Sequence, residues 1–208
     1  MKGISILRIM AIDSKAYKLV PIIDTIMRSK EDNMLKLFFN SPTKEWHFEE
    51  ILKQANITRS KGAGWLKVFL RQGLVKKVKE KGKMPHYTGN YESAAYKNRK
   101  KLFALSELYN SGLLNHLASL PAADTVVLFG SFSRSDWYEK SDIDIFIYGD
   151  YSGLKIAGFE QKLHRYIEIF NCKDKGELKK FGEGLLSNII KGNLIKGDMN
   201  FVRVGINA

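Results

Sequence analysis

The chain has 208 residues, of which 44% are hydrophobic, enough for one large domain or two small ones with real cores. Its single cysteine, Cys172, excludes an intramolecular disulfide framework and a cysteine-based zinc site, and it favours a reducing compartment. The whole net charge of +12 lies in residues 1–120, which hold 22 Lys and Arg against 10 Asp and Glu. This uneven distribution favours contact with a polyanion over a uniformly solvated basic surface.

The distribution of apolar residues argues against a membrane protein. No apolar run approaches the roughly 20 residues that a membrane-spanning helix needs. The N-terminus is mildly apolar, but Arg8 interrupts it and no small-residue cleavage site follows, so the pattern does not predict a signal peptide. We therefore expect a cytoplasmic protein that does not contact a membrane.

Residues 1–92 predict a small helical domain preceded by a helical extension. The apolar spacing indicates helices over residues 15–30, 31–42, 43–57 and 58–73. Thr43 is the expected N-cap of the third helix, and Gly73 is expected to end the fourth. Residues 74–89 then place apolar residues among lysines on both sides of a glycine turn, which predicts a two-stranded hairpin with a basic tip.

In their order of elements, residues 31–92 resemble a winged helix-turn-helix domain. In that family the third helix enters the major groove of DNA, and the hairpin, or wing, contacts the backbone or the minor groove. The resemblance implies nucleic-acid binding, with DNA as the expected partner. Nine basic residues would make the contacts: Arg59, Lys61, Lys67, Arg71, Lys76, Lys77, Lys79, Lys81 and Lys83. Winged helices also serve as protein-interaction modules and often form homodimers, so a protein partner and a homodimer remain open.

Residues 93–120 predict one long amphipathic helix or two shorter ones, because their leucines keep helical spacing. We expect this segment to connect the N-terminal domain to a second domain over residues 121–208 and to pack on both.

Two short motifs in the second domain carry the candidate chemistry. An apolar strand over residues 125–129 ends at Gly130 and Ser131, and a second strand contains Asp142 and Asp144, which alternation places on one face. Two such carboxylates repel each other unless a hard divalent cation, Mg²⁺ or Mn²⁺, compensates them. A glycine-serine turn brings backbone N–H groups and a hydroxyl close to phosphate oxygens. Together the motifs predict phosphoryl or nucleotidyl transfer.

The segment GSFSRSDWYEKSDIDIFI resembles the signature of minimal nucleotidyltransferases of the DNA polymerase beta type. A Gly-Ser turn, a spacer of the same length and a Ser-Asp-x-Asp motif all match, at Gly130, Ser131, Ser141, Asp142 and Asp144. The resemblance implies an α+β fold with a mixed sheet, metal binding by the two aspartates and a nucleoside triphosphate substrate, with ATP expected. The turn, Ser141 and Arg134 would bind the nucleotide. Family members commonly have glycine after this arginine, where this chain has Ser135.

The family site needs a third carboxylate on a later strand. Glu168 lies in the only later strand-like run that contains an acidic residue in alternation, where it shares a face with Tyr166 and Phe170. Glu168 is therefore the candidate third metal ligand or general base. Asp150 and Asp174 are weaker candidates, which we assign to surface turns.

Two further features of this domain concern its aromatic residues and its C-terminal segment. Trp137 and Tyr138, between the two halves of the signature, could stack on a base or pack against the domain. The C-terminal segment predicts a helix over residues 178–191 and an edge strand over residues 201–206.

The sequence thus predicts a metal-dependent nucleotidyltransferase whose basic N-terminal domain delivers or anchors a nucleic acid or nucleoprotein target. Minimal enzymes of this family act on proteins, including toxin partners, or on small molecules, and the sequence does not select the acceptor. Two interpretations from other classes stay open. One is a DNA-binding regulator whose second domain senses a nucleotide or is inactive, and the other is an antitoxin-like protein acting through a protein partner.

Overall fold

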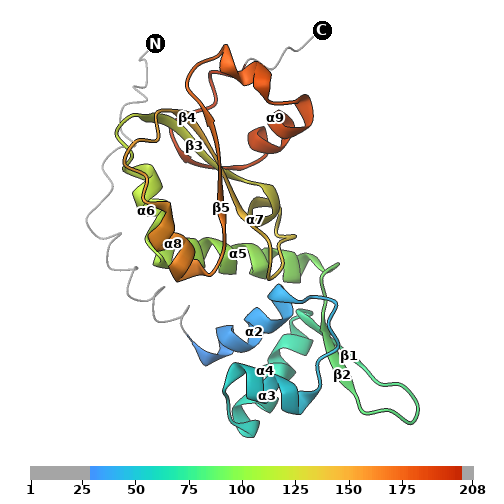
Figure 1. Cartoon of the computed structure of the whole chain (residues 1–208). Coiled ribbons are helices and arrows are strands. Elements are labelled where there is room, and N and C mark those ends of the chain that lie inside the picture. Colours follow the sequence, from blue (N-terminus) through green and yellow to red (C-terminus); the bar gives the residue numbers. More distant parts are fainter. Residues whose placement is uncertain (1–28, 203–208) are drawn as a thin grey trace, which may run out of the picture.

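The computed structural model describes residues 29–202 (Figure 1). The predicted helix over residues 15–30 falls almost entirely outside this range, and so does most of the strand predicted over residues 201–206. Within the described residues, no helix is long and apolar enough to cross a membrane.

The first elements form a small helical unit with a hairpin, shown at the bottom of Figure 1. They are α2 (Lys30–Asn40), α3 (Phe48–Ala55), α4 (Arg59–Arg71), β1 (Val75–Val78) and β2 (His86–Gly89). Strands β1 and β2 pair antiparallel, as the hairpin prediction required. Gly73 follows α4 with φ of +69°, a conformation that glycine adopts without steric cost, so the predicted end of this helix is confirmed.

The predicted start of α3 at Thr43 is wrong. The helix begins at Phe48, and His47 occupies the N-cap position. The reason lies in Trp46, which forms an isolated antiparallel bridge with Tyr87 of β2 through two backbone hydrogen bonds of 2.9 Å. This pairing holds Trp46 extended, beside the hairpin, so the helix cannot start before it.

The connector forms two helices, α5 (Ala94–Asn110) and α6 (Leu113–Ala118). Gly112 separates them with φ of +87°. The side chain of Ser93 caps the start of α5 by accepting a hydrogen bond from the Tyr96 backbone. Helix α5 is fastened to α2 by two ion pairs, of which Arg99 with the buried Asp32 is the more enclosed.

The remaining elements build a four-stranded mixed sheet with helices on both faces. They are β3 (Ala123–Phe129), α7 (Gly130–Arg134), β4 (Ile143–Gly149), α8 (Ile156–Leu163), β5 (Ile167–Cys172), η2 (Glu177–Lys180), α9 (Glu183–Ile190) and β6 (Asn193–Lys196). The strand order is β5-β4-β3-β6. Strand β3 is antiparallel to both neighbours, while β4 and β5 run parallel. The fold is therefore α+β with a mixed sheet, in agreement with the prediction for this part of the chain.

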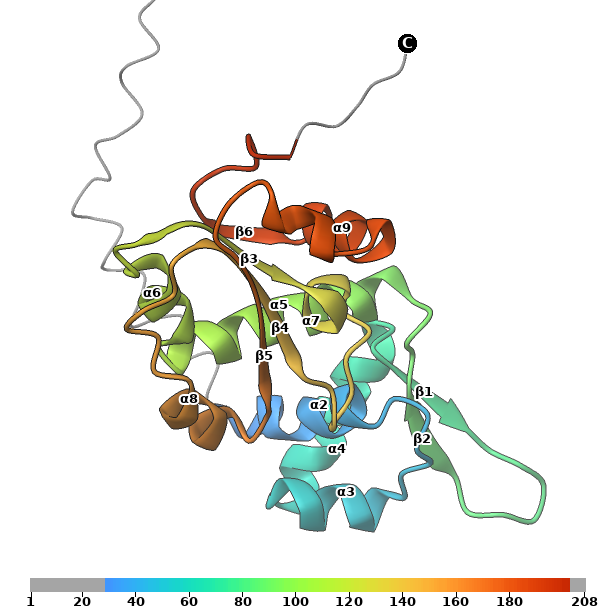
Figure 2. The same ribbon diagram turned by 45° about the horizontal axis from the view of Figure 1, so that its top comes forward.

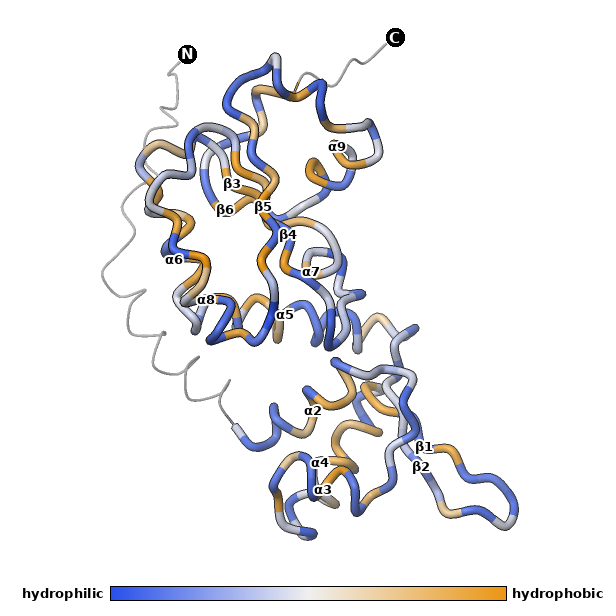
Figure 3. The backbone as a smooth tube through the Cα atoms, viewed as in Figure 1, coloured by the Kyte–Doolittle hydropathy of each residue, from blue (hydrophilic) through white to orange (hydrophobic). Residues whose placement is uncertain are grey.

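Alternating residues of β3 and β4 supply two separate apolar clusters, one on each face of the sheet. Ile143, Ile145 and Ile147 belong to a large cluster that continues through α5 and α6 into α2, α3 and α4. On the opposite face, Phe129 and Phe146 pack in a smaller cluster with α9 and the C-terminal residues. Figure 2 shows α9 beside β6 and β3, and Figure 3 shows hydrophobic stretches in the strands and in the helices. The helical unit and the sheet therefore share one continuous core.

The C-terminal segment differs from its prediction. The helix predicted over residues 178–191 is divided into η2 and α9. The edge strand is β6, which comes earlier than predicted, because Gly192 lies close against β3 and lets the chain turn directly from α9 into the sheet. Phe201 and Val202 lie in a turn and a bend, and Phe201 stacks on Tyr148 with ring centroids 4.3 Å apart.

Candidate active site

The candidate carboxylates lie at one end of the neighbouring strands β4 and β5. Asp144 is the second residue of β4, and its partner across the parallel pairing with β5 is Glu168. Paired residues of neighbouring strands project to the same face, and adjacent strands lie about 4.8 Å apart. The register therefore places Glu168 beside Asp144, as the alternation predicted. Both side chains emerge on the face that carries Phe146 and Phe170, beyond the part packed by α9.

Asp142 completes the group from just outside the sheet. It lies immediately before β4 and is exposed, whereas Asp144 is half-buried and Glu168 is exposed. The prediction had placed both aspartates inside a buried strand. Only Asp144 is within the strand, because pairing begins at Ile143, whose N–H donates to the Tyr166 carbonyl at 2.9 Å.

The Gly130 turn lies directly against Asp144. Phe129, the last residue of β3, pairs with Asp144 in the antiparallel register, and Gly130 follows with φ of +66°. A Cβ at Gly130 would overlap Oδ2 of Asp144. Glycine is therefore required here both by the backbone conformation and by the closeness of the carboxylate. The two halves of the sequence signature meet at this contact.

The electrostatics of the site centre on Asp144. Burial raises the pKa of its carboxyl above the usual value, and the negative charges of Glu168 and Asp142 raise it further. Arg134 and a hydrogen bond from the Ser131 backbone act in the opposite direction but do not reverse the shift. Three carboxylates are thus close enough to interact, and their mutual repulsion is only partly compensated by the protein.

Hard divalent cations fit this donor set, because carboxylate oxygens are their preferred ligands and a cation would relieve the repulsion that raises the Asp144 pKa. Among residues 29–202, however, no three His, Cys, Asp or Glu side chains are close enough to form a complete metal site. The three carboxylates are therefore neighbours, but their side chains are not arranged as a complete set of metal ligands.

The other predicted nucleotide-binding residues lie in α7 and in the turn that precedes Asp142. Ser131 and Arg134 lie in α7, and the exposed Arg134 forms an ion pair with Asp136 at 2.9 Å. Ser141 is buried, and its hydroxyl accepts a hydrogen bond of 2.9 Å from the Tyr138 N–H. Ser141 thereby shapes the turn that leads into Asp142, and contact with a nucleotide remains a prediction for all three residues.

Ser135 adopts the backbone conformation that glycine would favour. It follows α7 with φ of +67°, in the left-handed region. Serine at this position therefore carries a backbone strain that glycine would avoid.

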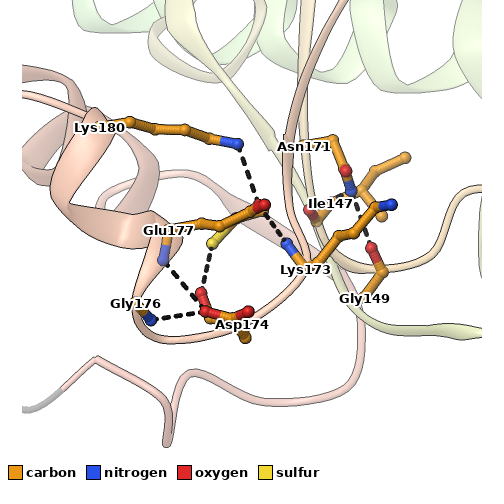
Figure 4. Close-up of polar contacts among 9 residues, drawn as sticks. Ile147, Gly149, Asn171, Lys173, Asp174, Gly176, Glu177 and Lys180 are labelled. Atoms are coloured by element: carbon orange, nitrogen blue, oxygen red, sulfur yellow. Dashed lines mark hydrogen bonds and ion pairs between the residues drawn. The ribbon is translucent and has the colours of Figure 1, made fainter.

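The two weaker acidic candidates serve local turns. Asp150 accepts hydrogen bonds from Ser152, and these lower its pKa. Asp174 accepts from the backbone N–H groups of Gly176 and Glu177 at 2.7 and 3.1 Å, as Figure 4 shows. Asp174 lies two residues after the end of β5, at the opposite end of the strand from Glu168. Neither aspartate joins the carboxylate group, so the assignment of both to turns is confirmed.

Of the two aromatic residues between the signature halves, Trp137 packs and Tyr138 is exposed. Trp137 is buried and stacks on Phe132 of α7 and on Phe103 of α5. Stacking of Trp137 on a nucleotide base is therefore ruled out in this structure. Tyr138 is 56% exposed and stays available for such a contact.

Two basic residues around Trp137 were missed from the sequence. Lys100 of α5 is buried, donates a hydrogen bond to the Trp137 carbonyl, and has its pKa lowered to about 8 by burial. Arg165, just before β5, lies over the rings of Phe132 and Trp137 at 5.1 Å. Lys100 is the middle residue of the basic run 99–101, which is typical of a solvated surface, so nothing in the sequence indicated that it is buried. For Arg165 the sequence indicated only that it lies next to a strand.

The nine basic residues predicted to bind nucleic acid lie on α4 and the hairpin and are all exposed. Three of them form ion pairs with nearby glutamates: Arg59 with Glu49, Lys76 with Glu92, and Lys83 with Glu80. The others make no ion pair within the described part of the chain. The exposed face of α4 carries Lys67 and Arg71 next to small residues.

Comparison with known proteins identifies one relationship. Residues 113–198 match the family model described as "Polymerase beta, Nucleotidyltransferase", so the C-terminal part of the chain is similar to these nucleotidyltransferase domains. The matched range begins at α6, ends shortly after β6, and includes all three carboxylates. A search of curated proteins found no match.

Proposed function

We propose that the protein is a metal-dependent nucleotidyltransferase that moves a nucleoside monophosphate from a nucleoside triphosphate, ATP in the simplest case, to a hydroxyl acceptor. The observation that carries the proposal is the meeting of Asp144 with Glu168 across β4 and β5, directly beside the Gly130 turn. The family match over the same residues supports it.

Each group in the site has a role in this reaction. The acceptor oxygen attacks the α-phosphorus, the bond from that phosphorus to the bridging oxygen breaks, and pyrophosphate leaves. Glu168 is exposed and is the candidate base that receives the proton of the acceptor hydroxyl. The turn at Gly130 and Ser131 binds the phosphates through backbone N–H groups, and Arg134 contributes positive charge beside it.

Asp142, Asp144 and Glu168 would hold Mg²⁺ or Mn²⁺. Such an ion supplies charge neutralisation for the phosphates and for the leaving pyrophosphate. The repulsion from Glu168 and Asp142 that helps to raise the pKa of Asp144 supports this assignment, because a bound cation would compensate the charges of all three carboxylates.

Transfer is tested with labelled nucleoside triphosphates, Mg²⁺ and a set of acceptors: nucleic acid, proteins from a cell extract, and small hydroxyl compounds. We expect label to appear on one acceptor class and to disappear in Asp142→Asn and Asp144→Asn, with a loss of at least about 100-fold, as expected when a group that stabilises the transition-state charge is removed. Asp150→Asn is the matched control, because this exposed carboxylate bonds only to its own turn. Full activity in Asp144→Asn would overturn the proposal.

We also propose that the N-terminal unit is a winged helix-turn-helix that binds nucleic acid through α4 and the hairpin. The support comes from element order and from the surface of α4. Lys67 and Arg71 are exposed without ion pairs among the described residues, and Gly64 on the same face would admit a Cβ into open space. A helix surface with small residues and two free cations can approach a phosphate backbone closely.

Binding of duplex DNA, measured by fluorescence anisotropy at several salt concentrations, tests this second part. Each lost phosphate contact lowers the salt slope by roughly 0.9. We expect Lys67→Ala and Arg71→Ala each to show this change. Lys76→Ala is the control and should show a smaller one, because Lys76 is already paired with Glu92. Equal salt slopes in all four proteins would contradict a nucleic-acid surface on α4, and binding of a stoichiometric protein instead would favour the antitoxin-like interpretation.

A further inference from the structure

One guanidinium group holds the turn that precedes the candidate metal ligands. Nη1 of Arg165 lies 2.7 Å from the Tyr138 carbonyl, 2.8 Å from that of Glu139 and 2.9 Å from that of Ser141. Its two N–H groups share these three acceptors. The next residue after this turn is Asp142, so Arg165 fixes the backbone from which the first carboxylate projects.

The same guanidinium reaches the N-terminal helical unit. Nη2 donates to Oδ1 of Asn40 at 3.1 Å, across 125 residues of sequence. Asn40 is the last residue of α2. Its backbone carbonyl also accepts a hydrogen bond from the Glu139 N–H at 3.0 Å. The end of α2 is therefore linked to the turn in two ways, by a direct backbone hydrogen bond and through the Arg165 side chain.

Packing keeps Arg165 in this position. The guanidinium lies over the rings of Phe132 in α7 and Trp137 in the spacer, at 5.1 Å from each centroid. Only an arginine has a planar fork that can stack on rings and donate to several carbonyls at once, and hydrogen bonds from a charged donor are the stronger kind. The residue is thus held by α7, the spacer and α2 together.

Asp142 is also within the electrostatic influence of this group. The Asp142 carboxylate is among the charges that favour the protonated form of Arg165. Movement of the guanidinium would therefore change both the backbone position of Asp142 and the positive charge near it.

We infer that Arg165 and Asn40 form a latch through which the seating of α2 controls the geometry of the Asp142–Asp144 site, so that events on the N-terminal unit regulate the C-terminal one. Arg165 is a positioning residue in this arrangement and does not touch the reacting atoms. The inference rests on the proposed transfer activity for its functional consequence, while the mechanical coupling itself stands on the hydrogen bonds.

Hydrogen exchange of the full-length protein tests the coupling without reference to activity. In Asn40→Ala the amide of Glu139 reports the contact with α2, and the amides of Ser141 and Ile143 report transmission toward the carboxylates. We expect exchange at Ser141 and Ile143 to rise about fivefold, the size expected from the loss of one net hydrogen bond. Asn40→Asp keeps the acceptor and adds a charge opposite Arg165, so its exchange should equal or fall below that of the wild type.

Asn110→Ala is the matched control, because Asn110 also ends a helix but bonds within it, to Ser106. It should exchange like the wild type at Ser141 and Ile143. Unchanged exchange at these two amides in Asn40→Ala would overturn the latch.

The functional consequence is measured as the Mg²⁺ dependence of transfer. We expect Asn40→Ala and Arg165→Lys to need several-fold more Mg²⁺ for half-maximal rate, with the KM for the acceptor unchanged, and Asn40→Asp to restore the wild-type value. A residue with a merely structural role would lower the amount of folded protein without moving the Mg²⁺ midpoint. If the wild type transfers no nucleotide, the proposed function fails, and the exchange experiment still decides whether α2 and the turn are coupled.

Discussion

Replacement of Gly130 by alanine tests the central contact of the site. Gly130 has φ of +66°, and an L-residue in the left-handed region costs about 1–2 kcal/mol. The added Cβ would also overlap Oδ2 of Asp144 and lie 2.7 Å from its Cγ. We therefore expect Gly130→Ala to lower the free energy of unfolding by this backbone cost and by a further ~1–2 kcal/mol for displacing the Asp144 side chain.

A double-mutant cycle separates the two contributions. In Asp144→Ala the atoms Oδ2 and Cγ are absent, so adding Gly130→Ala should cost only the backbone strain and the milder contact with the remaining Cβ. The free energy of unfolding is measured by urea denaturation in a chelator, followed by tryptophan fluorescence. The expected coupling energy is about 1–2 kcal/mol.

Gly153→Ala is the control for backbone strain alone. Gly153 has φ of +92°, and a Cβ there would meet nothing within 4 Å. Its loss of unfolding free energy should be equal to or slightly smaller than that of Gly130→Ala in the Asp144→Ala background, where the contact with the Cβ of residue 144 remains. If the losses of Gly130→Ala and Asp144→Ala are additive, the turn and the carboxylate do not touch. The conclusion that the two halves of the signature meet at this contact would then be wrong.

Two further predictions concern residues around the spacer. Lys100 has its pKa lowered by burial to about 8 from 10.5, so between these values the unfolded chain keeps a proton that the folded chain has released. The unfolding free energy of the wild type relative to Lys100→Met should therefore rise by about 3 kcal/mol between pH 7 and pH 11, and a flat difference in urea titrations would contradict a buried amine. Ser135→Gly should stabilise the protein by about 1 kcal/mol by relieving a positive φ, whereas Asn56→Gly should gain less, because asparagine tolerates this conformation better; thermal unfolding measures both.

The sequence was sufficient for the parts of the site that follow from strand periodicity. Alternation around Glu168 put it on the face that the parallel register then brings beside Asp144. The hairpin, the end of α4 and the turn at Gly130 also followed from local signals, because glycine at a positive φ leaves a mark in the sequence.

Features that depend on distant pairing could not be predicted in this way. The start of α3 is set by the bridge between Trp46 and Tyr87, which are 41 positions apart in the chain, although Thr43 is a residue type that favours the N-cap position. Arg165 and Asn40 were likewise unremarkable until the fold brought them together. Hydrophobic periodicity predicts on which face of its own helix or strand a residue lies. It does not predict which other element packs against that face.

The spacer between the two halves of the signature acquires a role from these contacts. Trp137 lies between Phe132 of α7 and Phe103 of α5, and its carbonyl accepts the hydrogen bond from the buried Lys100. The spacer is therefore anchored to the connector helix at its middle and to α2 through Arg165 at its end. Because the Gly130 turn begins this segment and Asp142 follows it, the spacing between the turn and the carboxylates depends partly on Asn40, Lys100 and Phe103, which precede the C-terminal sheet in the chain. An isolated fragment beginning at β3 would keep the signature but lose the contacts from α2 and α5, so transfer assays should use the full chain.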